Sequence, residues 1–345
     1  MLGSPISIPA RRKMENDMRP THLALAFSVM ASMAHAQTPV LKVLTYDSFT
    51  SEWGPGPAIE TGFEATCACD LQWVTGGDGA AILTRMRLEG AGSDIDVVVG
   101  LDTALTENAS KTNLLAPHGL TVAHDLPVAF ADPLFLPYDW GWFAFVYDNT
   151  KLTNPPKSFK ELAASEVKIV IQDPRSSTPG LGLLMWIKAA YATESAAIWA
   201  DLADNIVTVT PGWDQAYGLF LAGEADMVLS YTTSPAYHLI AEQDATKSAA
   251  AFTEGHYMQV EVAGLLASSV NPDLARSFLT YLTSEAAQSV LPTTNWMYPA
   301  KTPAAGLPAG FETLINPPKS LLFSAVEAEG LRQSAVEEWQ TVLAR

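Results

Sequence analysis

The sequence has few basic residues, few cysteines and no long apolar run, and each shortage excludes a class of protein. Lys and Arg number 20 against 37 Asp and Glu, which argues against nucleic acid and anionic membranes as partners. The apolar core of the N-terminal segment, Leu23 to Ala34, is too short to span a bilayer as a mature helix. The sequence also lacks internal repeats and low-complexity tracts. With 48% hydrophobic residues, it can bury a sizeable core.

The first 36 residues are typical of an export signal. Arg19 precedes the apolar core, and Ala34-His35-Ala36 is a small-x-small cleavage signal. We expect a signal peptide that begins at Met18 and is cut after Ala36, with residues 1–17 an over-extended start. No cysteine follows the cut, so a lipid anchor is not expected. The mature chain keeps a net charge of −19, which is compatible with a cationic ligand and equally with a soluble, self-repelling exported protein.

The two cysteines, Cys67 and Cys69, are one residue apart. In an oxidising compartment such a pair can close a tight disulfide or remain as two thiols. A metal site would need further ligands, and no histidine lies close by in the sequence. The pairing therefore stays open at this point.

Strands alternate with helices in two separate regions. The first region runs from a strand at Val40–Thr45 to a strand at Ile95–Gly100, and the second runs from Val167 to about Leu239. Such alternation is typical of parallel sheets. A long aromatic strand at Pro137–Tyr147 lies between the regions, and a strand at His256–Leu266 follows the second. Two crossings between two α/β units make a hinge, and hinge closure around a ligand is a known device.

Two polar stretches follow buried strands and precede helices. In one, Leu229 to Tyr237, hydroxyl residues and two tyrosines surround Pro235, and the other runs from Asp173 to Gly180. Proline after Ser or Thr favours a helix start, whose free N–H groups suit an anion or a polar ligand edge. One such stretch alone is equally typical of an ordinary capped helix. Two of them, both at strand ends, favour a binding crevice of an open α/β sheet.

The chain resembles type II periplasmic solute-binding proteins, and among them is similar to the thiamine-binding proteins of bacterial thiamine import systems. The matching runs are spread over nearly the whole mature chain: Thr45 to Phe49, Trp53 to Pro57, Gln172 to Arg175, Ser177 to Leu183, Leu229 to Tyr237, Glu254 to Tyr257 and Asn295 to Pro299. The stretch from Val122 to Pro133 is unmatched. The resemblance implies an α/β fold with two doubly wound lobes, a hinge and a ligand cleft. The expected lobes are residues 37–138 with about 265–310, and residues 139–264, and the lobe of the helical segment 311–345 stays open.

The resemblance also implies a set of ligand-binding residues. The positions that fall on the family's binding motifs are Asp78, Gly79, Ser177, Thr178, Trp213, Tyr231, Thr232, Thr233 and Ser234. Further cleft aromatics are expected at Tyr46, Trp53, Tyr237 and Trp296. Aromatic faces suit the cationic thiazolium and flat pyrimidine of thiamine, and a carboxylate at Asp78 suits the cation or the pyrimidine amine. Each aromatic alone is also compatible with core or hinge packing.

The implied function is transport without catalysis. The expected ligands are thiamine and its mono- and diphosphate, the expected partner is an inner-membrane ABC permease, and the expected protein is a periplasmic monomer without a metal or resident cofactor. One alternative is a thiamine-cleaving enzyme of the same fold, but its cysteine nucleophile would have to be Cys67 or Cys69, which we place away from the strand C-termini. Another alternative is an iron or polyamine binder. Iron capture in similar proteins uses two adjacent tyrosines, which this sequence lacks, and a polyamine site would want several cleft carboxylates, of which Asp47, Asp78 and Asp102 are the candidates.

Overall fold

The computed structural model describes residues 38–343, so the expected signal segment lies outside the described residues. A twisted sheet runs through this part of the chain, in the strand order β2-β1-β3-β10-β5-β8-β6-β7. Its main strands are β1 (Val40–Thr45), β2 (Asp70–Thr75), β3 (Val97–Asp102), β5 (Phe135–Asp148), β6 (Ile169–Gln172), β7 (Ile206–Thr210), β8 (Met227–Tyr231) and β10 (His256–Leu266). Short strands add to its rim: β4 (Leu115–Ala116), β9 (Lys247–Ala249), β11 (Tyr298–Pro299) and β12 (Ser320–Leu321).

The strand pairing divides this sheet into two parallel groups. In the first, β1 pairs in parallel with both β2 and β3. In the second, β6 pairs in parallel with both β7 and β8. Strands β3 and β6 are buried at every position, as expected for parallel strands that helices cover on both faces. The two alternating regions of the sequence therefore form the two ends of the sheet.

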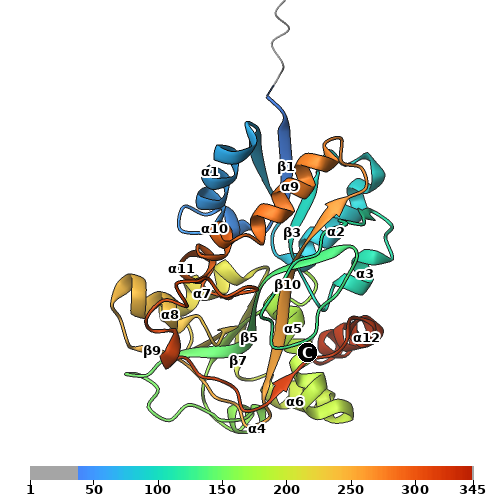
Figure 1. Cartoon of the computed structure of the whole chain (residues 1–345). Coiled ribbons are helices and arrows are strands. Elements are labelled where there is room, and N and C mark those ends of the chain that lie inside the picture. The colour runs from blue at the N-terminus through green and yellow to red at the C-terminus, as the bar shows by residue number, and fades with distance from the viewer. Residues whose placement is uncertain (1–37, 344–345) are drawn as a thin grey trace, which may run out of the picture. The chain divides into compact units, whose positions relative to one another are not determined.

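Strands β5 and β10 join the two groups. They pair with each other antiparallel in the middle of the sheet, and Figure 1 shows them side by side. β10 also pairs with β3 of the first group, whereas the second half of β5 pairs with β8 of the second. This confirms the mixed α/β architecture. The contacts hold residues 38–343 together as one compact unit, so the exact lobe boundaries stay a prediction.

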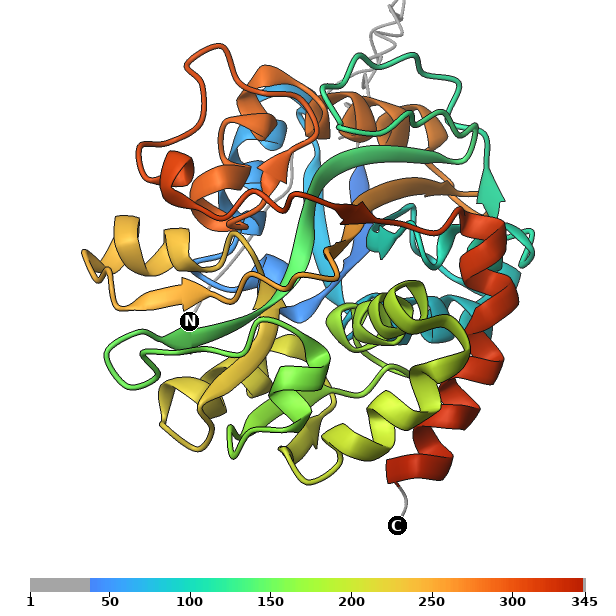
Figure 2. The ribbon, with the colours of Figure 1, turned by 90° about the horizontal axis from the view of Figure 1, so that it is seen from below.

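The helices cover both faces of the sheet. Those near the first group are α1 (Gly56–Cys67), α2 (Gly79–Glu89), α3 (Thr106–Ser110), α9 (Pro272–Leu282), α10 (Glu285–Gln288) and α11 (Leu291–Thr294). Those of the second group are α4 (Phe159–Ala163), α5 (Thr178–Tyr191), α6 (Ser195–Leu202), α7 (Trp213–Leu221) and α8 (Pro235–Tyr237). The last helix, α12 (Ala325–Leu343), packs against α5 and α6 and also against α3, as Figure 2 shows in red. None of these helices combines the length and the apolar character that a membrane crossing requires.

The segments around Pro235 and Pro292 form short helices. The stretch Pro292–Pro299 begins inside α11 and ends in β11. The helix expected at Pro235 is three residues long and continues as a π-helical turn, His238–Glu242. Proline predicts where a helix begins, but not how far it continues.

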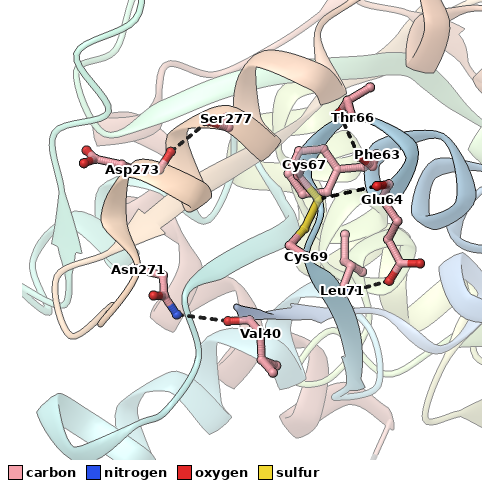
Figure 3. The surroundings of a disulfide bond; sticks show 10 residues. All are labelled: Val40, Phe63, Glu64, Thr66, Cys67, Cys69, Leu71, Asn271, Asp273 and Ser277. Carbon is pink, nitrogen blue, oxygen red and sulfur yellow. Dashed lines mark hydrogen bonds between the residues drawn. A yellow bond between two sulfur atoms is a disulfide. The ribbon is translucent and has the colours of Figure 1, made fainter. Parts of the chain in front are cut away.

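The two cysteines form a disulfide across Ala68, which adopts φ 50° at the end of α1 (Figure 3). The turn from α1 into β2 is held at the same place by the Glu64 carboxylate, which accepts the Leu71 N–H at 2.8 Å. Neither cysteine is among the residues that line the cleft described below. This settles the pairing and agrees with the expected position away from the cleft.

Candidate functional site

A cleft of about 250 Å³ opens where residues from both strand groups meet. Residues along almost the whole described chain line it: Tyr46, Ser48, Trp53, Asp78, Gly79, Thr178, Pro179, Trp213, Asp214, Tyr217, Gly218, Leu221, Tyr231, Ser234, Tyr237, Glu261, Asn295, Trp296 and Met297. The lining contains seven aromatic side chains, three carboxylates, and no Lys, Arg or His. Such a cleft favours a flat ligand and disfavours a free anion.

Most of the expected site residues line this cleft. The exceptions are Ser177, Thr232 and Thr233, which are buried behind its wall. Ser177 acts on the cleft indirectly, because its hydroxyl donates to the Asp78 carboxylate. The Thr233 hydroxyl contacts the sulfur of Met297 at 3.6 Å, and Thr232 Oγ1 has no partner among the described residues.

Asp78 lies where three helices begin. It precedes the first residue of α2, and its Oδ2 accepts the hydroxyl of Ser177, just before α5, at 2.6 Å. The same oxygen accepts the N–H of Trp213, the first residue of α7, at 3.0 Å. Helix N-termini are partially positive and suit a carboxylate. Burial raises the pKa of Asp78 to about 6, although these two hydrogen bonds lower it.

The same junction brings the two strand groups into direct contact. The N–H of Gly79 donates to Thr178 Oγ1 at 3.2 Å, and the N–H of Ala81 donates to the Ser176 carbonyl at 3.0 Å. A Cβ at Gly79 would lie 2.5 Å from Thr178 Oγ1, so the close approach of α2 to α5 requires glycine. Asp78 therefore holds the two walls of the cleft together as well as lining it.

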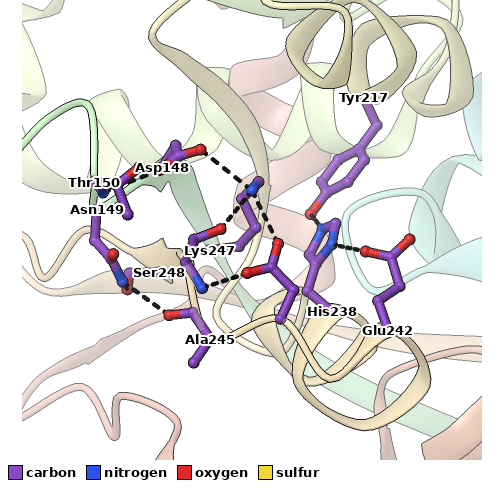
Figure 4. A network of polar contacts seen from close by, with 11 residues as sticks. Asp148, Asn149, Thr150, Tyr217, His238, Glu242, Ala245, Lys247 and Ser248 are labelled. Carbon is purple, nitrogen blue, oxygen red and sulfur yellow. Dashed lines mark hydrogen bonds and ion pairs between the residues drawn. The ribbon is translucent and has the colours of Figure 1, made fainter.

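Contacts within the protein hold the side chain of Trp213 in place. Its indole N–H donates to Ser230 at 2.8 Å, and its ring stacks on Tyr217 with centroids 5.0 Å apart. Tyr217 in turn contacts His238 through its hydroxyl at 2.9 Å, and the other ring nitrogen of His238 lies 2.7 Å from Glu242 (Figure 4). The chain of contacts holds the indole in one orientation, as a ring that must stack on a ligand requires.

His238, Glu242 and Asp244 place their ligand atoms within 4.8 Å of one another, as a metal site would. Both ring nitrogens of His238 already have partners, however, and Asp244 pairs with Lys247 at 3.2 Å. Lys247 also pairs with Asp148 at 3.3 Å, as Figure 4 shows. We therefore interpret this group as a support of the cleft wall.

A second pair of aromatic rings forms another part of the wall. Tyr237 and Trp296 meet edge to face with centroids 5.4 Å apart. Trp296 adopts φ 56°, an uncommon conformation for a bulky residue, in the turn from α11 into β11. Trp53, 45% exposed, lies at a centroid distance of 6.2 Å from Trp213. The expected aromatics are thus gathered in one place although up to 250 positions separate them, from Tyr46 to Trp296.

The N–H groups of the stretch from Leu229 to Tyr237 are less available than expected. Tyr231 donates to Ser234 Oγ, and Thr232 donates to the Trp142 carbonyl. The N–H groups of Ser234 and Tyr237 bond to carbonyls within the same turn. Most N–H groups of this turn are therefore already bonded within the protein, so its binding of an anion or a polar ligand edge stays a prediction that these hydrogen bonds do not favour.

The floor of the cleft contains a residue that sequence reasoning missed. Glu261 of β10 is 6% exposed, and its Oε2 accepts the Tyr138 hydroxyl at 2.7 Å and lies 3.1 Å from the Tyr46 hydroxyl. Gly100 makes room for this arrangement, because a Cβ there would lie 2.2 Å from the Tyr46 ring. A carboxylate within a mostly apolar, buried strand was the available signal.

Comparison with known proteins agrees with this geometry. The family profile of bacterial extracellular solute-binding proteins matches residues 52–289. The thiamine-binding periplasmic protein of Escherichia coli K12 is 50% identical over 310 residues, which cover 89% of this chain and 94% of the relative. A solved periplasmic thiamin binding protein superposes with a TM-score of 0.87 at 49% identity, covering 90% of this chain and 98% of that structure.

More distant structures share the fold alone. Iron-bound HitA from Pseudomonas aeruginosa has a TM-score of 0.69 at 17% identity, covering 88% of this chain and 99% of that structure. Such a likeness carries no information on the ligand. With half of its residues shared with the thiamine-binding relative over nearly all of both chains, this chain belongs to the bacterial extracellular solute-binding proteins, in the group of thiamine-binding periplasmic proteins.

Proposed function

We propose that the chain binds thiamine in the cleft and delivers it to the permease of an ABC importer. The observation that carries this proposal is a cleft lined by aromatic rings and carboxylates and by no basic side chain. Thiamine combines a permanently cationic thiazolium with a flat aminopyrimidine. Each contact of such a cation with an aromatic face contributes roughly 0.5–2 kcal/mol. The names of the relatives that share about half of the sequence support the same ligand.

The residues fall into three roles in this proposal. Trp213, Tyr237 and Trp296 supply faces for the rings, with Tyr46, Trp53 and Tyr231 beside them. Asp78 and Gly79 with Ser177 and Thr178 hold the walls together around the ligand and offer polar atoms to it. Thr232, Thr233 and Ser234 support the turn that presents Tyr231, since the Ser234 hydroxyl bonds to both Ser230 and Tyr231.

The mono- and diphosphate esters are proposed as further ligands, weaker than thiamine. The cleft has no basic side chain to pair with a phosphate, so the esters would depend on hydroxyls and on the N-terminus of α5 near Thr178. Relatives are named as periplasmic proteins, and we propose the same compartment here, reached by cleavage after Ala36. We also propose that the protein is a monomer with two lobes, whose bounds are those that the sequence indicates. The lobes would close on the ligand by a hinge at β5 and β10.

The chain is not an enzyme, since its family is a non-enzymatic part of transport systems. The structure adds a chemical reason: Cys67 and Cys69, one of which a thiamine-cleaving enzyme would need as its nucleophile, are joined in a disulfide.

Calorimetric titration of thiamine tests the proposal, with residues 37–345 refolded to remove any carried ligand. We expect saturable one-to-one binding and intact thiamine afterwards. Trp213→Ala should weaken binding about 2- to 30-fold, from the loss of a stacking face. Leu88→Ala, on the exposed surface of α2, should leave affinity unchanged. Absence of binding, or cleavage of thiamine, would contradict the proposal.

A further inference from the structure

Three carboxylates lie in one row across the middle of the sheet. Glu261 of β10 is paired in register with Asp102 of β3 on one side and with Asp139 of β5 on the other. Residues opposite each other on neighbouring strands project to the same face, so the three side chains are neighbours. All are almost fully buried, with exposed fractions of 1% for Asp102, 6% for Glu261 and 0% for Asp139.

No cation of the described residues forms an ion pair with this acid row, as we call Asp102, Glu261 and Asp139. Its hydrogen-bond donors are neutral: the tyrosine hydroxyls at Glu261, and the Asn295 amide, which donates to Asp139 at 2.6 Å. Oδ1 of Asp102 and Oδ1 of Asp139 have no partner among residues 38–343 although both are buried. Buried charges in proteins are normally paired with an opposite charge. The acid row is unusual because the described residues offer it no positive partner.

The surroundings of the row favour its protonated forms. Groups that face it from the neighbouring elements are Tyr46, Tyr138, Tyr231, Gln259, Asn295 and Asp78. None of them is positive. Burial and the charge of Glu261 raise the pKa of Asp102 to about 7, and burial next to Glu261 raises the pKa of Asp139 well above its usual value. A positive charge that entered the cleft would reverse this effect.

Only Glu261 of the three lines the cleft, together with Tyr46, which bonds to Glu261, and Asn295, which bonds to Asp139. A quaternary ring nitrogen has no hydrogen to donate, so it can be recognised by aromatic faces and by a nearby negative charge. We propose that the acid row is the counter-charge by which the cleft selects a permanently cationic ring over a neutral ring of the same shape, with Glu261 facing the ligand and Asp102 and Asp139 acting through it. The inference rests on the proposed function and deepens it.

The test compares thiamine with its analogue in which a neutral thiophene replaces the thiazolium. Both carry the same pyrimidine and have nearly the same shape, so the ratio of their affinities at pH 7.5 isolates the ring charge. In the unmodified protein we expect thiamine to bind about 10- to 100-fold more tightly. Glu261→Gln should reduce this preference about 10-fold and change affinity for the neutral analogue less than about 3-fold. The amide oxygen can still accept the two tyrosine hydroxyls.

Asp273→Asn is the matched control, because it removes a carboxylate that is fully exposed on α9. It should leave the preference unchanged. If Glu261→Gln does not fold, Asp102→Asn replaces it, with a smaller reduction expected since Asp102 does not reach the cleft. A preference that survives substitution in the row, or is absent from the unmodified protein, overturns the inference alone. Binding of neither ligand would instead contradict the proposed function.

Discussion

Two carboxylates that line the cleft, Asp78 and Glu261, have different surroundings. Asp78 lies at the starts of three helices, and its Oδ2 receives a hydroxyl and a backbone N–H from the opposite wall. Glu261 lies between two other buried acids and receives only tyrosine hydroxyls. The protein gives the first carboxylate two hydrogen bonds, which partly offset its burial and join the walls. The second is left without a positive partner, so a ligand can supply one.

Removal of the carboxylate at Asp78 should produce the largest loss of thiamine affinity. Asp78→Ala leaves the Ser177 hydroxyl and the Trp213 N–H without their acceptor and separates the walls of the cleft. Hydrogen bonds to charged groups contribute about 1.5–3 kcal/mol each, so thiamine affinity should fall about 100-fold or more. Asp78→Asn keeps an acceptor oxygen and should lose about 10-fold or less. Equal affinity of Asp78→Ala and the unmodified protein by calorimetry would contradict the joining role.

Acid should act oppositely on stability and on affinity. The pKa of Asp78 is raised to about 6 and that of Asp102 to about 7, so the folded protein binds protons that the unfolded chain releases. The contribution of these groups to the free energy of unfolding should therefore increase as pH falls from about 7 toward 5. Protonation also removes negative charge from the cleft, so thiamine affinity should decrease over the same range.

Urea unfolding of the ligand-free protein and titration of thiamine, both at several pH values, check this pair of trends. In Asp102→Asn the stability trend should be weaker, because one of the titrating groups is gone. Stability and affinity that fall together on acidification from pH 7 to 5 would show that other groups dominate.

A smaller effect is expected from the support of Trp213. Tyr217→Phe removes the hydroxyl that contacts His238 but keeps the ring that stacks on the indole. The free energy of unfolding should fall by about 1 kcal/mol, and affinity by about 5-fold, as the indole loses its fixed orientation. Tyr217→Ala, which also removes the stacked ring, should reduce both stability and affinity further. An equal loss in both variants would mean that the hydroxyl, and not the ring, positions Trp213.

The smallest effect on binding is expected far from both carboxylates. Replacing Cys67 and Cys69 by Ser opens a three-residue loop at the turn between α1 and β2. Closure of so short a loop contributes about 1.5 kcal/mol to stability in the chain-entropy picture. The variant should unfold at lower urea concentration with unchanged thiamine affinity. A changed affinity would show that this turn influences the cleft.

Much of the fold was predictable because it depends on local patterns. The strands Val40–Thr45 and His256–Leu266 have the bounds that the sequence indicates. The polar stretch at Ser177 does precede a helix, and the resemblance predicted the aromatics that the cleft gathers. The strands and the helix start rest on periodicity and on residue types within a few positions, whereas the aromatics rest on the resemblance.

The acid row was not predictable in the same way. Asp102, Asp139 and Glu261 become neighbours through the register of two antiparallel pairings, each interrupted by a shift in register beside Glu261 or Val262. Register between strands more than 100 residues apart depends on tertiary packing, and one residue of slip would turn the side chains to the other face. The shortness of the helix after Pro235 was also not predictable. It depends on hydrogen bonds with neighbouring strands, such as the bond from the Thr232 N–H to the Trp142 carbonyl.

The most direct test of the central claim counts protons. Calorimetry at pH 6.5 in two buffers of different ionisation enthalpy gives the protons released on binding, for thiamine and for the neutral thiophene analogue. The pyrimidine is common to both, so the difference reports the response of the protein to the ring charge. We predict that thiamine releases more protons than the analogue, because the cation lowers the pKa values of the acid row. Equal proton release by the two ligands would contradict the claim that the cleft recognises a cation through its buried carboxylates.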